Sequence, residues 1–396
     1  MQAAGELSIL MPETIFVAGS LAQKPRQAGH TWVFLQYLLG FKHLGWDVLF
    51  LDRIEPGMCV DSNGRLCPLE NSMNLRYFME VMQGFGLEGQ FALSYNGGEQ
   101  FIGLSKQEVL ARAKRSAMLL NVMGYFTGED VLADVSRRVF LDIDPGFGQM
   151  WQDLGLHDPF KGHDAYVTIG ENIGNPDCAI PTCGLQWITT PQPVVLDYWP
   201  AQPIANNGWF TSIGSWRGPY GPVEYKGNTY GLRVHEFRKF APLPRLSGRP
   251  FQMALDIHPS ETRDIALLTE NGWSLVDPGT IAADPWVYRE YVQDSKAEFM
   301  VSKNMYVQSN SGWFSDRSIT YLASGRPVLA QDTGIRTLYP TGEGLLTFST
   351  LEEALSGVED IEREYARHAR AARAIAEEYF DSDKVLPKLL SKLGVA

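Results

Sequence analysis

The 396-residue chain has few cysteines, no excess of positive charge and no long hydrophobic run, and each shortage excludes a class of protein. Four cysteines at 59, 67, 178 and 183 are too few for a disulfide framework, and neither pair has the C-x-x-C spacing of a zinc ribbon. The net charge of −12 disfavours duplex nucleic acid and membrane surfaces as partners, because both are anionic. The most apolar stretch, 32–41, is far shorter than the ~20 residues that span a bilayer.

The remaining composition is that of an ordinary globular protein with an excess of aromatic residues. The N-terminal MQAAGELSIL lacks the basic segment and long apolar stretch of a secretory signal, so we expect a cytoplasmic protein. At roughly 150 residues per domain, the length predicts two or three domains. The 10 Trp, 16 Tyr and 20 Phe are densest at 199–230 and 313–314. Such rings either border a ligand cleft or pack between domains, and the sequence favours neither.

Two successive alternations of strands and helices predict two parallel α/β sheets. The first half has apolar strand patterns at 14–20, 46–52, 91–95, 137–142 and 165–171. The second half has them at 209–216, 251–257, 273–278, 297–303 and 326–332. A stretch rich in Pro, Gly and Asn separates the two, and the end of the chain is helical with alternating charge. We therefore expect domains at 1–190 and 209–360, a linker at 191–208 and C-terminal helices at 361–396.

Ligands of such domains bind beyond the carboxyl ends of the strands, and 309–334 contains the strongest candidate. Ser315, Asp316 and Ser318 fall where a helix should begin, just after Gly312. The free amides and the dipole of that first turn would bind an anion, and Arg317 would add a charge-assisted contact. The alternative is purely structural, with Ser315 a helix cap and Arg317 a surface cation. The chain lacks both the GxGxxG fingerprint and the P-loop, which disfavours a dehydrogenase.

Three further groups follow predicted strands, and each is also compatible with an ordinary turn or cap. His30 begins the first helix, where the helix dipole favours the neutral imidazole that a general base needs. Asp142 and Asp144 share one face of their strand, so they could orient an imidazole, bind a sugar hydroxyl or hold a metal. In the second half, Arg217 is placed to contact a diphosphate or stack on a ring, and Asp332 and Thr333 to bind sugar hydroxyls.

Taken together, these positions resemble a nucleotide-sugar-dependent glycosyltransferase of the GT-B fold. The stretch QAGHTWVFLQYLLGFKHLGWDVLFLD is similar to that fold's opening loop, first helix and second strand. SGWFSDRSITYLASGRPVLAQDTG resembles its donor-binding loop and helix, and 358–392 its terminal helices. The resemblance implies two Rossmann-like domains facing across a cleft, with C-terminal helices that cross back to the first domain. It implies an enzyme of hexosyltransferase type, moving a sugar from a nucleoside-diphosphate sugar to an acceptor hydroxyl.

The resemblance also implies roles for individual residues. His30 matches the base of inverting members, with Asp142 or Asp144 as the carboxylate that orients it. The donor site would comprise Ser311, Gly312, Trp313 and the turn from Ser315 to Ser318, with Val276 and Asp277 near the nucleobase. We expect no metal and no cofactor beyond the sugar nucleotide, and a small-molecule or glycan acceptor, aromatic if the ring-rich segments border the cleft. A homodimer is left open.

The chain departs from the family pattern in the segment that usually distinguishes its members. Retaining members carry a paired-glutamate motif there, but no glutamate occurs between Glu298 and Glu343. Plant-like inverting members carry a His-Gly-Gly start, whereas this chain has Asn310-Ser311-Gly312. The match at His30 favours inversion. A sugar-nucleotide epimerase on the same fold, or a degenerate GT-B subunit that binds a partner, remain the alternatives.

Overall fold

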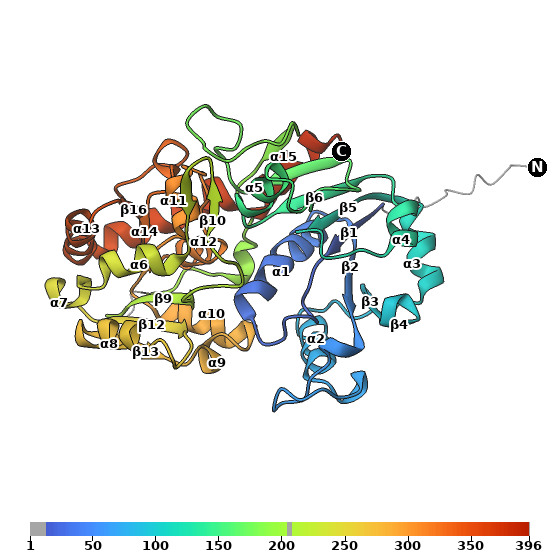
Figure 1. Cartoon of the computed structure of the whole chain (residues 1–396), viewed down its shortest axis with the longest axis horizontal. Coiled ribbons are helices and arrows are strands. Elements are labelled where there is room, and N and C mark those ends of the chain that lie inside the picture. Colours follow the sequence, from blue (N-terminus) through green and yellow to red (C-terminus); the bar gives the residue numbers. More distant parts are fainter. Residues whose placement is uncertain (1–12, 204–207, 396) are drawn as a thin grey trace, which may run out of the picture.

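Two parallel β-sheets, one in each half of the chain, form the framework of the computed structural model, which describes residues 13–203 and 208–395 (Figure 1). The strand order is β4-β3-β2-β1-β5-β6-β7-β8 in the first sheet and β13-β12-β9-β14-β15-β16 in the second. All neighbours pair in parallel except β3 and β4. In both sheets the order reverses beside the first strand, as in a Rossmann fold, which confirms the predicted fold class.

The first sheet is covered by helices on both faces. Its strands are β1 (Thr14–Ala18), β2 (Asp47–Ile54), β3 (Phe91–Tyr95), β4 (Gln100–Gly103), β5 (Ser116–Val122), β6 (Arg138–Asp142), β7 (Ala165–Thr168) and β8 (Trp187–Thr189). Its helices are α1 (Ala28–His43), α2 (Met73–Gly84), α3 (Lys106–Ala113), α4 (Glu129–Asp134) and α5 (Phe147–Asp153). Successive residues of β1 enter different cores, with Ile15 and Val17 in the one that includes α1, and Phe16 and Ala18 in the one that includes α3.

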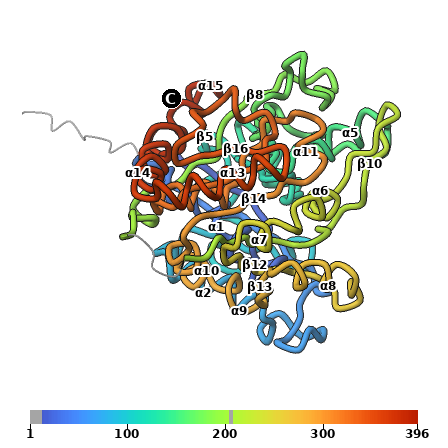
Figure 2. The backbone as a smooth tube through the Cα atoms, turned by 90° about the vertical axis from the view of Figure 1, so that its left-hand side faces the viewer, coloured from blue at the N-terminus to red at the C-terminus, as the bar shows by residue number. Residues whose placement is uncertain are grey.

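The second sheet follows the same plan. Its strands are β9 (Phe210–Ser215), β12 (Phe251–Asp256), β13 (Trp273–Val276), β14 (Ala297–Met300), β15 (Val328–Gln331) and β16 (Leu345–Phe348). Its helices are α6 (Arg233–Phe240), α7 (Leu243–Ser247), α8 (Thr262–Glu270), α9 (Pro278–Ile281), α10 (Pro285–Asp294), α11 (Asn304–Gln308), α12 (Asp316–Ala323) and α13 (Leu351–Arg363). The antiparallel hairpin of β10 (Val223–Tyr225) and β11 (Asn228–Tyr230) leaves this half and reaches α5, where Tyr225 donates to Asp153 at 2.7 Å (Figures 1 and 2).

The C-terminal helices cross back to the first half, as expected from the resemblance. After α14 (Tyr365–Ile375) the chain turns, and α15 (Ser382–Leu393) packs on α1. The contact is close because α1 has a glycine there: a Cβ on Gly40 would lie 2.5 Å from Leu386 Cδ1. The crossing segment also pairs with the segment that links the halves, since Val194 N–H donates to Phe380 O at 2.7 Å and Ser382 N–H to Val194 O at 2.9 Å.

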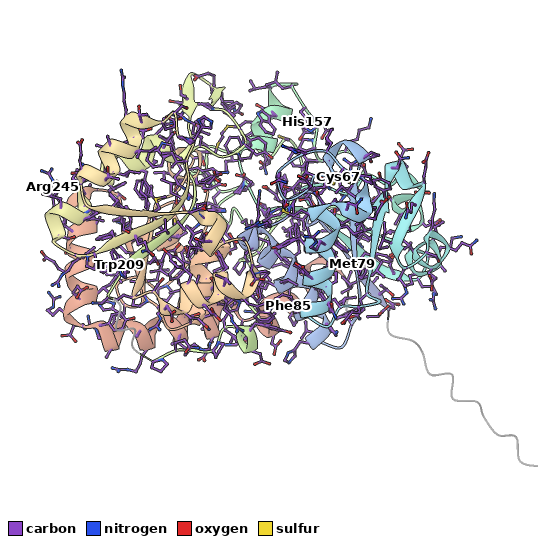
Figure 3. All side chains as sticks on the ribbon, turned by 90° about the horizontal axis from the view of Figure 1, so that it is seen from below. Cys67, Met79, Phe85, His157, Trp209 and Arg245 are labelled. Atoms are coloured by element: carbon purple, nitrogen blue, oxygen red, sulfur yellow. The ribbon has the colours of Figure 1, made fainter. Side chains whose placement is uncertain are left out.

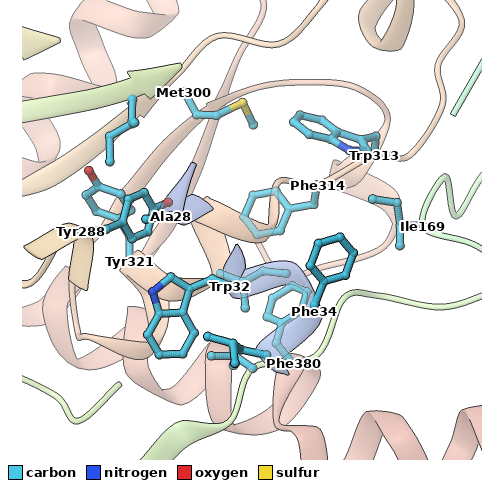
Figure 4. Close-up of a cluster of buried hydrophobic side chains, with 14 of the residues drawn as sticks. Ala28, Trp32, Phe34, Ile169, Tyr288, Met300, Trp313, Phe314, Tyr321 and Phe380 are labelled. Carbon is cyan, nitrogen blue, oxygen red and sulfur yellow. The ribbon is translucent and has the colours of Figure 1, made fainter. Parts of the chain in front are cut away.

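Some rings of the ring-rich segments pack where the two halves meet, whereas others, such as Trp216 against Phe237, pack within the second half. Trp199 is fully buried and lies 4.8 Å from Trp32 of α1, centroid to centroid. Trp313 stacks on Tyr306 at 4.3 Å, and Phe314 packs against Phe380 (Figure 4). These rings therefore join the halves as an aromatic core. Across the described ranges, no helix has both the length and the apolar character that a membrane crossing needs.

Candidate functional site

A cavity of about 450 Å³ lies where the β1–α1 loop of the first half faces the strand ends of the second. It is at the carboxyl end of β9, next to the reversal of strand order, where ligands of open α/β sheets bind. Both halves contribute to its lining: Pro25 to His30 from the first, and Ile213, Gly214, Ser215, Asp256, Pro278, Gly279, Ala282, Tyr288, Asp316 and Arg317 from the second.

The first turn of α12 brings two of the predicted donor-site residues into this cavity. Asp316 and Arg317 line it, and Ser315 occupies the N-cap position without capping the helix through its hydroxyl. The Ser318 hydroxyl is buried and has no hydrogen-bond partner in the described part of the chain. Burial raises the pKa of Asp316 above its ordinary value. A helix N-terminus with an unpartnered hydroxyl in its first turn is suited to a ligand that accepts hydrogen bonds.

Two arginine side chains converge on the end of β9. Arg317 donates to the Ile213 carbonyl at 2.8 Å and is held by an ion pair with the buried Glu298 at 2.5 Å. Arg233, the first residue of α6, donates to the same carbonyl at 3.4 Å. No carboxylate lies within ion-pair distance of Arg233 among the described residues. Burial and the charge of Arg317 lower the pKa of Arg233 to about 10. The site therefore contains one neutralised guanidinium and one whose charge is unpaired.

Gly214 makes room for this second guanidinium. A Cβ at position 214 would lie 1.8 Å from Nη1 of Arg233 and 2.9 Å from its Cζ. Any larger residue would displace the arginine from its place beside the cavity wall, so this glycine is required by a close approach.

His30 enters the cavity from the opposite half. Its Nε2 lies 2.9 Å from the hydroxyl of Ser20, and its ring packs edge-on against Phe34 and Tyr125. Burial, together with the charge of Lys24, lowers the pKa of His30 to about 3. The imidazole is therefore neutral across the physiological range of pH.

The two aspartates expected to orient His30 have other partners. Asp142 accepts from Gln149 at 2.6 Å and Thr168 at 2.9 Å, and burial raises its pKa to about 6. Asp144 lies 2.6 Å from Nζ of Lys303 and accepts from the hydroxyl of Tyr306, both in the second half. In the described chain, neither aspartate is hydrogen-bonded to His30, whose partner is a serine. Their catalytic role stays a prediction.

The other predicted residues lie around the cavity. Arg217 points away at the surface, paired with Glu261, its side chain 47% exposed. Val276 ends β13 and Asp277 caps α9, and the next two residues, Pro278 and Gly279, line the cavity. The remaining predicted residues hold the 311–313 loop in place. Gly312 N–H donates to Thr333 O, Thr333 Oγ1 to Trp313 O, and Trp313 N–H to Ser311 Oγ. Asp332 forms an ion pair with Arg336.

The residues that sequence reasoning missed are Ser20, Lys24, Tyr125, Gly214 and Arg233. One signal was available for Arg233. It is a cation at the start of a helix, where the dipole disfavours positive charge, and such a residue calls for an anionic partner. The others depend on contacts between loops that are far apart in the sequence.

The fold and the site together define the class of the protein. Two Rossmann-like sheets that face across a ligand cavity, with terminal helices crossing back, form the GT-B fold of glycosyltransferases. More specifically, residues 257–391 match a family model described as glycosyl transferase-like. A comparison with curated protein sequences found no match.

Solved structures of the same fold extend over nearly the whole chain. One is an α-glucosyltransferase in complex with UDP and a 13-mer DNA, 12% identical over 97% of this chain and 100% of that one, with a TM-score of 0.58. Another is HepE of Anabaena in complex with UDP-glucose, 12% identical over 97% and 100%, with a TM-score of 0.56. A third is AviGT4, a glycosyltransferase involved in avilamycin A biosynthesis, 11% identical over 96% and 97%, with a TM-score of 0.55. At these identities the likeness establishes the fold.

Proposed function

We propose that this protein transfers a hexose from a uridine-diphosphate sugar to a hydroxyl group of a small molecule or glycan. The observation that supports this most strongly is the unpaired guanidinium of Arg233, which lies behind Ile213 and Gly214 of the cavity lining and shares the Ile213 carbonyl with Arg317. A diphosphate would supply the anionic partner that Arg233 lacks, and guanidinium groups bind phosphate oxygens through parallel hydrogen bonds. The choice of uridine rests on the fold neighbours bound to UDP and UDP-glucose.

In the proposed reaction the acceptor oxygen forms a bond to the anomeric carbon while the bond from that carbon to the diphosphate breaks. The acceptor hydroxyl loses its proton and the nucleoside diphosphate leaves. Arg233, Arg317 and the first turn of α12 would stabilise the charge that develops on the departing diphosphate, because fixed donors in a partly dry site need little reorganisation. The protein itself would supply the positive charge that stabilises the leaving diphosphate. We therefore expect the transfer to proceed without added metal and to survive a chelator.

The acceptor would meet the donor on the side of the cavity formed by Pro25 to His30. Inversion at the anomeric carbon, as the resemblance implies, requires His30 to take the acceptor proton. Whether it can do so depends on which ring nitrogen carries the hydrogen. Epimerisation is the alternative reaction on this fold, and it needs no acceptor. If the protein is a transferase, UDP should be released from a UDP-sugar only when an acceptor is supplied.

UDP binding to matched arginine variants tests the proposal. Arg233→Met removes the unpaired guanidinium, and Arg245→Met is the control because Arg245 is exposed on α7 at the outer edge of the molecule (Figure 3). A hydrogen bond to a charged group contributes ~1.5–3 kcal/mol, so Arg233→Met should weaken UDP binding about 10- to 150-fold in calorimetric titration. The control should match the unsubstituted protein. Equal affinity of both variants, or no binding of UDP at all, would refute the proposed donor site.

A further inference from the structure

Two cysteines stand opposite each other in a short hairpin between β2 and α2 (Figure 1). Val60 and Leu66 form its antiparallel bridge. The next pair outward is Cys59 and Cys67, with Cys67 N–H donating to Cys59 O at 3.1 Å. The register therefore places the two cysteines directly across from each other. We call this segment, residues 59–67, the cysteine hairpin.

This register meets the distance and the direction that a disulfide needs. Residues opposite each other at a hydrogen-bonded antiparallel position have Cα atoms ~5.5 Å apart, and their side chains lie on the same face of the ladder. Disulfides join Cα atoms that are about 4.4–6.8 Å apart. Burial raises the pKa of the Cys59 thiol, and the nearby Cys67 adds to the rise. The backbone thus holds the two thiols within reach of a covalent bond.

The two thiols differ in their access to solvent. Cys59 is fully buried, and its Sγ donates to Glu55 O at 3.6 Å. Cys67 is only partly buried (Figure 3). An oxidant in solution would therefore react first at Cys67, and the buried Cys59 would be the resolving thiol.

The cysteine hairpin is connected to the wall of the ligand cavity through Asn74. Val60 N–H donates to Asn74 Oδ1 at 3.0 Å, and Asn74 Nδ2 donates to Ala22 O at 2.8 Å. Asn74 is buried, and Ala22 belongs to the β1–α1 loop, whose continuation from Pro25 to His30 lines the cavity. One buried amide side chain therefore joins the hairpin to the loop that faces the ligand.

We propose that Cys59 and Cys67 form a reversible disulfide, a redox modification site that steadies the β1–α1 loop through Asn74. With glutathione disulfide as the oxidant, the Cys67 thiolate attacks one glutathione sulfur, and the first glutathione leaves as a thiolate. The Cys59 thiolate then attacks Sγ of Cys67, and the second glutathione leaves with the bonding electron pair. The two protons lost by the cysteines end on the two glutathione thiolates. This site is independent of the proposed function.

Mass spectrometry after treatment of the full chain with glutathione disulfide tests the bond. All four cysteines are free thiols before oxidation. After oxidation, alkylation under denaturing conditions should label only Cys178 and Cys183, and digestion should release a peptide cross-linked between Cys59 and Cys67. Dithiothreitol should restore labelling of all four. Labelling of both Cys59 and Cys67 after oxidation, or a bond from either to another cysteine, would overturn the proposal.

Two serine variants test the order of the reaction. Cys59→Ser keeps the accessible thiol without its partner, so it should stop at a mixed disulfide between glutathione and Cys67. Cys67→Ser should stay unmodified while folded, because its remaining hairpin thiol is fully buried. The double variant Cys178→Ser/Cys183→Ser is the matched control and should form the disulfide like the unsubstituted chain. A mixed disulfide that also persists in the unsubstituted chain would show that Cys59 does not resolve it, and would overturn the proposal.

Hydrogen exchange measures what the bond does to the hairpin and to the loop. The stabilisation that a disulfide typically gives corresponds to about 30- to 700-fold, so exchange of the hairpin amides should slow by that factor on oxidation. Exchange in the β1–α1 loop should slow as well, but not in Asn74→Leu, which lacks the connecting amide. The β10–β11 hairpin is the control and should exchange equally in both redox states. Unchanged exchange in the β1–α1 loop of the unsubstituted chain, or slowing that persists in Asn74→Leu, would overturn the role of Asn74.

Discussion

Gly214→Ala is expected to weaken UDP binding without removing a single polar atom. The added methyl group would lie 1.8 Å from Nη1 of Arg233. Even a tight contact of 3.0 Å requires that nitrogen to move by at least 1.2 Å, the difference between the two distances. A hydrogen bond of ordinary length does not survive a displacement of that size. The substitution should therefore act on the proposed diphosphate site as a displacement of Arg233.

The size of the effect follows from the hydrogen bonding that the displaced guanidinium can no longer provide. If Arg233 gives one charge-assisted hydrogen bond to the diphosphate, its displacement costs ~1.5–3 kcal/mol, which is about 10- to 150-fold in affinity. In an Arg233→Met background the same methyl group meets a flexible, uncharged side chain, and the further loss should be close to zero. The coupling energy of the double-mutant cycle should therefore nearly equal the loss caused by Gly214→Ala alone.

Calorimetric titration with UDP measures all four corners of the cycle. Gly218→Ala is the matched control: a Cβ there would meet nothing within 4 Å, and its φ of +82° adds a backbone cost, as the φ of +158° does at Gly214. Thermal unfolding of each variant checks that the fold is intact. Unchanged affinity in Gly214→Ala, or losses that simply add in the double variant, would refute the placement of Arg233 at the diphosphate.

Three further predictions concern stability. Burial raises the pKa of Asp52 to about 7, so the folded protein binds that proton more tightly than the unfolded chain. The free energy of unfolding should therefore fall from pH 5 to pH 8, and urea titrations of Asp52→Asn should show a weaker decline. Gly40→Ala forces a methyl group into Leu386 and should lower the free energy of unfolding by ~1–3 kcal/mol, but by less in a Leu386→Ala background; losses that simply add would place the clash elsewhere. Tyr225→Phe removes the bond to Asp153 and should lower the free energy of unfolding by ~0.5–3 kcal/mol in urea, an effect that vanishes in Asp153→Ala if the bond is its cause.

Much of the fold could be predicted from the sequence because apolar strand patterns and helices alternate so regularly. One strand that the sequence did not predict is β5, seven residues long and central in the first sheet; the others are short or at an edge, such as β4, β8 and β16, each of three or four residues. A run of that length carries too few residues to show a period. The irregular stretch at 176–208 hid β8 in particular, because its Pro, Gly and Asn residues indicate a connection rather than a strand.

The candidate site was predictable where one local segment contains it and not where distant segments meet. Asp316 and Arg317 were found because capping residues and an arginine stand together at one helix start. Arg233 and Arg317, which both donate to the Ile213 carbonyl, are 84 positions apart in the sequence. Arg233 reaches this place only because residue 214 is a glycine, which the folded chain alone shows. Arg217 illustrates the reverse case: its place after β9 suits a ligand, but Glu261 holds it at the surface.

The pairing of Val194 with Phe380 and Ser382 has a mechanical consequence. The chain passes between the halves once before β9 and once before α15, and these hydrogen bonds tie the two crossings together. Two tethers bound side by side act as a single hinge, because a rotation about a line through both stretches neither of them. The two halves would then open the cavity most easily by rotating about this line. The polar contacts that join the halves, such as Lys303 with Asp144, would break if the halves separated by such a rotation.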